Sequence, residues 1–166
     1  IIEKEDGPYR VGIITVSDRA SQGVYEDKSG PVIKELVEEA GMEVIDSLIV
    51  PDEKSEIVKK LLHFSDQRQA DLIFTTGGTG FSKRDVTPEA TKQVVEREVP
   101  GIGEALRSYS MTITPKAMLS RQTAGIRGNT LIINLPGSPK ACRENIDYII
   151  KPLKHGLGIL SGRESD

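Results

Sequence analysis

The segment A-D-L-I-F-T-T-G-G-T-G-F-S-K-R-D-V-T-P-E-A-T, residues 70–91, joins a buried strand to a helix through a glycine turn. Leu72, Ile73 and Phe74 form the short apolar run that is typical of a parallel strand covered on both faces. The glycines that follow let backbone N–H groups approach an anion, and the neighbouring threonines add hydroxyl donors without charge. Because ligands of open α/β sheets bind beyond the carboxyl ends of the strands, the turn is predicted to be a phosphate site.

Charged residues follow the turn at once. Lys83, Arg84 and Asp85 precede Thr87 and Pro88, which we interpret as the N-cap and the first position of the next helix. G-G-T-G alone is equally compatible with a turn chosen only for its backbone angles. The carboxylate and two cations within one turn of a helix start favour a ligand site instead.

Two better-known phosphate motifs are excluded by spacing. No register of G-G-T-G-F-S-K-R supplies the G-x-x-x-x-G-K-[ST] of a P-loop. The first expected strand runs into S-D-R-A-S-Q-G, which lacks the glycine pair of a dinucleotide fingerprint. These differences argue against a nicotinamide-dependent dehydrogenase.

Strand and helix patterns alternate along the chain. Strands are expected at residues 11–16, 44–50, 72–75 and 131–134. Helices are expected at residues 31–40 and 57–62, from Thr87 to a break at Pro100 and Gly101, at 102–109, and from Pro139 with Ser138 as its N-cap. Residues 114–129 are expected to be irregular. This alternation predicts an α/β fold of three layers, a doubly wound, largely parallel sheet with helices on both faces, in a single domain over residues 1–166.

Composition narrows the function further. No apolar run approaches the length of a membrane span and no secretory leader is visible, so we expect a cytoplasmic protein without a membrane partner. The one cysteine, Cys142, cannot form an internal disulfide and is expected to be a buried structural thiol. The two histidines, His63 and His155, provide no Cys/His ligand spacing, which argues against zinc.

Acidic residues are unevenly spread. Asp and Glu outnumber Lys and Arg 25 to 22, yet none occurs from Ala105 through Arg143. That stretch contains Arg107, Lys116, Arg121, Arg127, Lys140 and Arg143. A basic face on an acidic protein predicts a small anionic ligand, whereas nucleic acid would require a broader excess of positive charge.

Four segments carry distinctive motifs: V-S-D-R-A-S-Q-G-V-Y-E-D-K-S-G-P (16–31), V-P-D-E (50–53), T-T-G-G-T-G-F-S-K-R-D-V-T-P-E-A-T (75–91) and M-L-S-R-Q-T-A-G-I-R-G-N-T-L-I-I-N-L-P-G-S-P (118–139). Together they resemble the molybdopterin adenylyltransferase family, which includes the MogA and MoaB proteins and the G domain of gephyrin and its plant counterpart. The resemblance covers roughly residues 9–160. It implies a homotrimer that transfers AMP from Mg-ATP to the terminal phosphate of molybdopterin, which releases pyrophosphate and prepares the pterin for molybdate insertion by a partner protein.

The resemblance also implies roles for residues. The attacking phosphate is already ionised at neutral pH, so the enzyme must align two polyanions and neutralise charge rather than supply a strong base. Asp52 and Asp85 match catalytic positions and would hold Mg²⁺, which takes one or two carboxylates plus substrate oxygens. The alternatives are a helix N-cap for Asp52 and a turn or capping acid for Asp85. The nucleotide phosphates would lie on Gly77, Gly78, Thr79 and Gly80.

Positions that resemble the pterin side of the family site form a larger set. They are Ser17, Asp18, Asp27, Ser120, Arg121, Pro136, Gly137 and Ser138. Arg121 and Arg127 are candidate anion partners because a guanidinium binds phosphate bidentately. Arg127 could equally be a surface or interface arginine, Asp18 and Asp27 turn acids, and residues 136–138 a plain helix start.

Two rival functions use the same features. A non-catalytic trimer could bind and deliver molybdopterin with the same turns, but only catalysis requires Asp52 and Asp85 together with a metal. A nucleotide-cleaving hydrolase is less favoured because no His or Glu that could activate water lies near the motifs. The residues leave open whether molybdenum or tungsten is loaded later.

Overall fold

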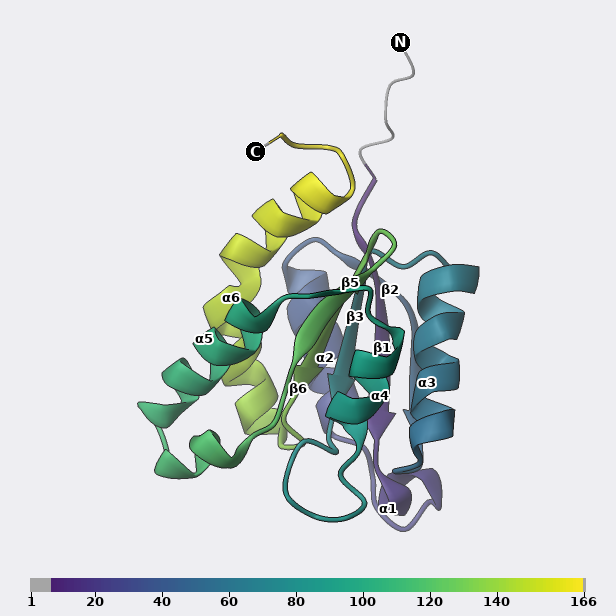
Figure 1. Cartoon of the computed structure of the whole chain (residues 1–166), viewed down its shortest axis with the longest axis vertical. Helices are drawn as coiled ribbons and strands as arrows, with labels where there is room; N and C mark the ends of the chain where they lie inside the picture. Colours follow the sequence, from purple (N-terminus) through teal and green to yellow (C-terminus); the bar gives the residue numbers. More distant parts are fainter. Residues whose placement is uncertain (1–6, 166) are drawn as a thin grey trace.

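A six-stranded sheet in the order β2-β1-β3-β6-β5-β4 forms the centre of the computed structural model, which describes residues 7–165 (Figure 1). Four strands are parallel: β1 (Arg10–Val16), β2 (Glu43–Val50), β3 (Leu72–Thr76) and β6 (Thr130–Leu135). The edge beside β6 is antiparallel, formed by β5 (Ala124–Arg127) and β4 (Arg97–Glu98).

Helices cover both faces of the sheet, which confirms the predicted three-layer α/β fold. One face carries α2 (Ser29–Glu39), α5 (Pro100–Met111) and α6 (Pro139–Leu160). The other carries α3 (Lys54–Leu62), a π-helical turn η1 (His63–Gln67) and α4 (Thr87–Val94). The short α1 (Asp18–Ser21) follows β1, and the 3₁₀ turn η2 (Pro115–Leu119) packs against α5.

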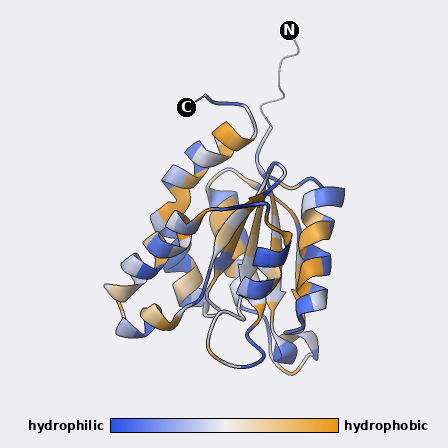
Figure 2. Ribbon diagram, in the orientation of Figure 1, coloured by the Kyte–Doolittle hydropathy of each residue, from blue (hydrophilic) through white to orange (hydrophobic). Residues whose placement is uncertain are grey.

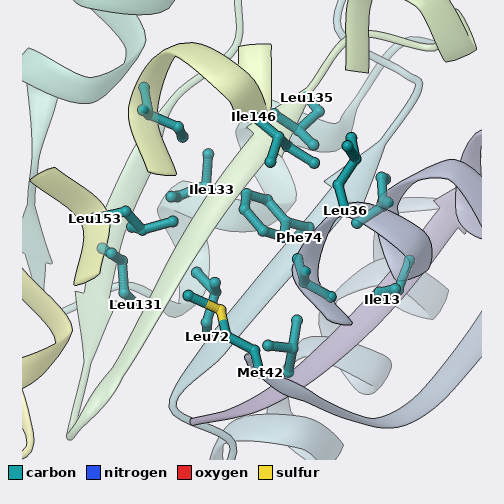
Figure 3. Packing of buried hydrophobic residues seen from close by; sticks show 14 of the residues in the cluster. Ile13, Leu36, Met42, Leu72, Phe74, Leu131, Ile133, Leu135, Ile146 and Leu153 are labelled. Atoms are coloured by element: carbon teal, nitrogen blue, oxygen red, sulfur yellow. The ribbon is translucent and has the colours of Figure 1, made fainter. Parts of the chain in front are cut away.

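Alternation along the strands divides the core in two. Ile13 of β1 and Phe74 of β3 face α2 and α6 (Figure 3). Ile14 and Ile73 face α3 and α4 on the other side of the sheet. All four side chains are fully buried, as expected for parallel strands covered on both faces. The apolar stripes of the covering helices, such as α3, turn toward the sheet and leave their polar sides in water (Figure 2).

The structure corrects three local predictions. The N-cap of α4 is Val86, and Thr87 is the first helical residue, fully buried. The segment expected to be irregular contains both η2 and β5. Pro100 does not end the third helix, because α4 already stops at Val94 and Pro100 begins α5.

The carboxyl ends of the parallel strands meet at one end of the molecule. In Figure 1 the loop between β3 and α4 and the α1 segment lie at the lower end, whereas β1 begins and α6 ends at the upper end. This lower end is where an open α/β sheet binds its ligand.

Among the described residues, the helices are too short or too polar to span a membrane.

Cys142 is expected to resist alkylation while the protein is folded. Its thiol is fully buried and contacts Thr76 Oγ1 at 3.3 Å and the Pro136 carbonyl at 3.2 Å, and burial raises its pKa to about 11. The reactive thiolate is therefore scarce at neutral pH. Mass spectrometry after iodoacetamide treatment should show labelling only in denaturant, and rapid labelling of the native protein would contradict the assignment of a structural thiol.

Candidate functional site

The glycine turn leaves β3 with two successive left-handed residues. Gly77 has φ +97° and Gly78 has φ +70°, a region that side chains disfavour. A Cβ on Gly77 would clash with the Val16 carbonyl oxygen, and one on Gly78 would clash with Thr87 Oγ1. The turn therefore requires glycine at both positions, and it fits tightly between the end of β1 and the start of α4.

Two carboxylates lock the loops after β1 and β2 together. Asp52 Oδ2 accepts the backbone N–H of Asp18 at 2.9 Å, and Asp18 Oδ1 accepts the backbone N–H of Asp52 at 2.9 Å. The N-cap of α3 is Glu53, so the alternative interpretation of Asp52 as a helix N-cap is wrong. Its Oδ1 stands 3.3 Å from the point where a Cβ on Gly78 would lie, against the glycine turn.

Arg84 joins the same pair from the other side. Its Nε and Nη2 donate to Asp18 at 3.0 and 2.9 Å, and Nη2 also reaches Glu53 at 3.0 Å. Arg84 holds the pKa of Asp18 below its usual value, whereas burial, together with the nearby Asp18 and Asp85, raises the pKa of Asp52. Burial and the like charges of Asp18 and Asp85 thus make the ionised form of Asp52 costly, and a cation bound beside Asp52 would offset that cost.

Asp85 lies against the opposite end of the turn. Its Oδ2 accepts the backbone N–H of Ser82 at 3.0 Å and stands 2.9 Å from the Cβ position of Gly80. Asp85 therefore makes a hydrogen bond within the turn, as its alternative interpretation predicted. It also faces the same glycine turn as Asp52, so the two carboxylates flank residues 77–80 from both ends.

Two hollows open on either side of this turn. The smaller, about 150 Å³ and here called the Asp27 hollow, is lined by Thr15, Val16, Ser17, Ala20, Tyr25, Asp27, Lys28, Ser29, Thr76, Gly77 and Gly137. The larger, about 310 Å³ and called the Ser120 hollow, is lined by Thr79, Gly80, Ser110, Thr114, Lys116, Ala117, Leu119, Ser120, Gln122, Pro136, Ala141 and Glu144. The turn thus lies between the two hollows, and of these the Ser120 hollow reaches the volume typical of a small-molecule site.

The residues predicted for the pterin divide between these hollows. Ser17, Asp27 and Gly137 line the Asp27 hollow, and Ser120 and Pro136 line the Ser120 hollow. Asp18, Arg121 and Ser138 line neither and are occupied elsewhere. The structure therefore gathers the predicted residues at one end of the sheet, although not around a single cavity.

Several predicted ligand residues also cap helices. Asp27 Oδ1 accepts the backbone N–H groups of Ser29 and Gly30 at 3.1 Å each, and Oδ2 accepts Thr15 Oγ1 at 2.8 Å. Ser138 accepts the N–H of Ala141 at 3.0 Å, which confirms it as the N-cap of α6. Their capping role and a role toward ligand are compatible, because a helix N-terminus attracts anions.

Arg121 and Arg127 lie at opposite ends of the sheet. Arg121 contacts the glycine turn, where its Nε donates to the Gly80 carbonyl at 2.8 Å. Arg127 forms a bidentate pair with Asp66, with both distances 2.9 Å, and donates to the Val94 carbonyl. The hypothesis that Arg127 binds the anion at this site is therefore wrong.

The expected basic face is mostly neutralised within the chain. Arg107 donates to the Gln122 carbonyl, Lys140 pairs with Glu144, and Arg143 pairs with Glu35. Arg121 and Arg127 also form ion pairs, with Glu89 and Asp66, whereas Lys116 lines the Ser120 hollow. Charge counting alone overestimated the free positive surface.

A buried polar network beneath the Ser120 hollow was not predicted. Gln122 Oε1 accepts Ser120 Oγ at 3.0 Å, and Nε2 donates to the Asn134 carbonyl at 3.0 Å and to Asn145 Oδ1 at 3.3 Å. Asn145 in turn donates to Ser110 at 3.0 Å. Asn134, which interrupts the apolar run L-I-I-N-L, offers this network only its backbone carbonyl, because its side chain donates to Thr75 and Thr91 and accepts the Thr123 N–H. The asparagine in the run therefore signals a separate set of buried hydrogen bonds, since buried amides require partners.

The described residues do not by themselves form a complete set of metal ligands. Among residues 7–165, no cluster of three or more His, Cys, Asp or Glu side chains could hold a metal ion. Asp52 and Asp85 supply two carboxylates beside the glycine turn. This donor set fits Mg²⁺ bound together with a nucleotide, because Mg²⁺ takes few protein ligands and completes its shell with phosphate oxygens and water.

Comparison with known proteins identifies relatives over most of the chain. Residues 12–155 match the family described as "Probable molybdopterin binding domain". A molybdopterin adenylyltransferase of Helicobacter pylori strain J99 is 46% identical over 154 residues, which cover 92% of this chain and 88% of that protein.

Solved structures agree with the fold. The molybdopterin biosynthesis enzyme MoaB from Thermus thermophilus superposes with a TM-score of 0.88 at 45% identity, covering 93% of this chain and 97% of that one. The tungsten cofactor synthesizing protein MoaB from Pyrococcus furiosus superposes with a TM-score of 0.84 at 36% identity, covering 92% and 97%.

Proposed function

The chain belongs to this family of molybdopterin-binding domains, and we propose that it is a molybdopterin adenylyltransferase. It transfers AMP from Mg-ATP to the terminal phosphate of molybdopterin and releases pyrophosphate. One observation carries the proposal: Asp52 and Asp85 approach the same glycine turn from both ends, 3.3 Å from the Cβ position of Gly78 and 2.9 Å from that of Gly80. Binding and delivery of the pterin would need the turn but not both carboxylates.

The proposed chemistry requires alignment more than proton transfer. A terminal phosphate oxygen of molybdopterin attacks the α-phosphorus of ATP, and the bond to the pyrophosphate leaving group breaks. The nucleophile is already ionised, so no side chain has to remove a proton. The amides of residues 77–80 hold the phosphates, and the turn keeps the two polyanions in line.

Asp52 and Asp85 would hold the Mg²⁺ ion that accompanies ATP. When bound, the ion supplies neutralisation of charge on the reacting phosphates. The reciprocal bonds between Asp18 and Asp52 support this role, because they fix Asp52 through Oδ2 and leave Oδ1 at the turn. We therefore assign Asp18 to the organisation of Asp52.

The ligands would meet over the glycine turn. Gly77, Gly78, Thr79 and Gly80 would bind nucleotide phosphates. We propose that Ser17, Asp27 and Gly137 in the Asp27 hollow, Ser120 and Pro136 in the Ser120 hollow, and Ser138 at the start of α6 contact the pterin substrate. The burial of the network below Ser120 supports this proposal, because a rigid polar floor can orient a ring with several donors and acceptors.

Product formation tests the proposed function directly. Purified protein incubated with molybdopterin and Mg-ATP should form adenylyl-molybdopterin and release pyrophosphate, detected by chromatography and a coupled phosphate assay. Omission of Mg²⁺ should abolish both products. Tight pterin binding without either product would replace the enzyme with a delivery protein, and phosphate release from ATP without pterin would indicate a hydrolase.

We propose that the protein assembles as a homotrimer. An apolar groove of about 470 Å³ runs between α5 and α6, and Tyr148 on its rim is 50% exposed. The adjoining segment exposes further large apolar side chains, namely Met111, Ile113, Met118 and Leu119. Exposed apolar surface of this extent favours contact with another subunit.

Sedimentation should therefore give three times the 18.1 kDa chain mass at micromolar concentration. Ile113→Glu should weaken the trimer, because a charge would be buried at the contact. Ile49→Glu is the matched control, since Ile49 is similarly exposed, 46% against 43%, but lies on β2 at the opposite edge of the sheet. A monomeric protein, or loss of assembly only with Ile49→Glu, would contradict this surface.

The remaining family properties are also proposals. A partner protein would take adenylyl-molybdopterin and insert molybdate, and the reaction would take place in the cytoplasm. The buried free thiol of Cys142 is compatible with a reducing compartment.

A further inference from the structure

Every nitrogen of the Arg121 guanidinium donates to the protein itself. Nε donates to the Gly80 carbonyl at 2.8 Å, Nη2 to the Asp85 carbonyl at 2.6 Å, and Nη1 to Glu89 Oε2 at 2.7 Å. We propose that Arg121 is a positioning residue, which closes the loop carrying Asp85 onto the glycine turn, and that it is not a ligand of the pterin phosphate.

The contacts of Arg121 join the two ends of one loop. Gly80 opens the segment 80–85 and Asp85 closes it, and one planar guanidinium binds both carbonyl groups. The Arg121 backbone N–H adds a bond to the Thr79 carbonyl at 2.8 Å. Removing the side chain would leave both ends of the loop without their shared partner, so the Asp85 carboxylate would lose its fixed distance from the turn.

Glu89 completes the geometry from α4. Its carboxylate binds Nη1, and Arg121 holds the pKa of Glu89 below its usual value. The guanidinium is thus charge-compensated and held in its plane by three partners on the loop and the helix. A substrate phosphate could recruit Arg121 only by displacing these partners, which makes a fixed structural role the favoured one.

The position of Arg121 in the chain also links the loop of Asp85 to the Ser120 hollow. Its neighbours Ser120 and Gln122 line the Ser120 hollow, while its side chain holds the loop of Asp85. The same short segment therefore forms a wall of one hollow and the support of the catalytic loop. The catalytic part of this inference rests on the proposed adenylyl transfer, whereas the loop closure does not.

Phe81 offers a direct probe of loop closure. It lies in the segment 80–85, is 72% exposed, and the chain contains no tryptophan, so Phe81→Trp introduces a single indole fluorophore. The Phe81→Trp protein is the reference, and Arg121→Ala is added to it. Arg127→Ala is the matched control, because Arg127 also donates through Nε, Nη1 and Nη2, in its case to one carboxylate and one carbonyl, but lies at the other end of the sheet.

Without ligand, Arg121→Ala should add a fast component to the anisotropy decay of the introduced indole and speed hydrogen exchange in residues 79–86, whereas Arg127→Ala should change neither. The Kd for Mg-ATP should rise about tenfold or more and turnover should fall on the order of 10²-fold, because the catalytic groups lose alignment. The Kd for molybdopterin should change far less. Arg121→Lys keeps the charge without the planar fork and should remain close to Arg121→Ala in loop mobility.

An unchanged anisotropy decay and exchange pattern with lost molybdopterin affinity would overturn the proposal and make Arg121 a ligand. Full recovery of both readouts by Arg121→Lys would also overturn it, because charge alone would then suffice. If Arg121→Ala does not fold, Arg121→Lys provides the same comparison, and Glu89→Gln provides it with smaller expected changes. Failure of adenylyl transfer in the reference protein would refute the proposed function and leave the ligand-free measurements valid.

Discussion

Asp85→Asn is expected to lower single-turnover adenylyl transfer on the order of 10²-fold or more, about 2.7 kcal/mol of transition-state stabilisation. Asparagine keeps the size of the side chain and an acceptor for the Ser82 backbone N–H, which Asp85 Oδ2 binds at 3.0 Å. The substitution removes only the negative charge beside the turn. Folding and molybdopterin affinity should therefore persist while turnover is lost.

Urea unfolding and molybdopterin affinity must be measured alongside the rate. Asp46→Asn is the matched control, because Asp46 also accepts one local backbone N–H, that of Ser47 at 2.8 Å, and lies on β2 away from the turn. Unchanged turnover in Asp85→Asn would assign Asp85 to the turn alone. A parallel loss of stability and pterin affinity would assign it to support of the loop.

The fold was predictable where local patterns and tertiary packing agree. Residues 72–74 form an apolar run that is typical of a doubly covered strand, and the glycines at 77 and 78 mark where the strand ends. The four parallel strands and their helices were expected for this reason. The site at their carboxyl ends followed from topology, because every parallel strand ends on the same side of the sheet.

The antiparallel edge was not predictable from local pattern. Arg97 and Glu98 of β4 are exposed, and they form a strand only because they pair with Ile126 and Gly125 of β5. Neither segment has the length or alternation that signals a strand by itself. Pairing across the sheet decided their conformation, which is the usual way in which tertiary context overrides local propensity.

The sequence also did not predict which groups the charged residues contact. Arg121 and Arg127 are the same residue type on one short segment, yet β5 (Ala124–Arg127) carries the chain from the glycine turn to the far end of the sheet. One arginine therefore reaches the candidate site and the other pairs with Asp66. Charge content predicts an anion site only when the positions of the opposing carboxylates are known.

Thr87 shows how a favoured local motif can yield to packing. Threonine before proline is a good N-cap, but Thr87 lies inside α4, and its hydroxyl is buried without a hydrogen-bond partner among the described residues. The backbone N–H of Thr87 instead donates to the Gly78 carbonyl at 3.1 Å. Contact with the glycine turn thus replaces side-chain capping.

Gly78→Ala is expected to destabilise the protein and to weaken Mg-ATP binding about tenfold or more. A left-handed residue with a side chain costs about 1–2 kcal/mol, and overpacking against Thr87 Oγ1 adds about 1–3 kcal/mol. The new methyl group would also stand 3.3 Å from Asp52 Oδ1, where it screens the carboxylate and the turn amides from a phosphate. Urea unfolding and titration with Mg-ATP measure the two effects.

Gly23→Ala separates the backbone cost from the clash, because Gly23 has nearly the same φ, +74° against +70°, with nothing within 4 Å of its Cβ position. It should show only the backbone part of the destabilisation and bind Mg-ATP normally. Adding Thr87→Ala to Gly78→Ala should recover most of the overpacking cost, since it removes the clashing hydroxyl and leaves no buried group without a partner. Mg-ATP affinity should stay low in this double variant, because the methyl group still lies between Asp52 and the turn. Recovery of affinity together with stability would instead mean that the turn binds nucleotide through its shape alone and that the approach to Asp52 plays no part.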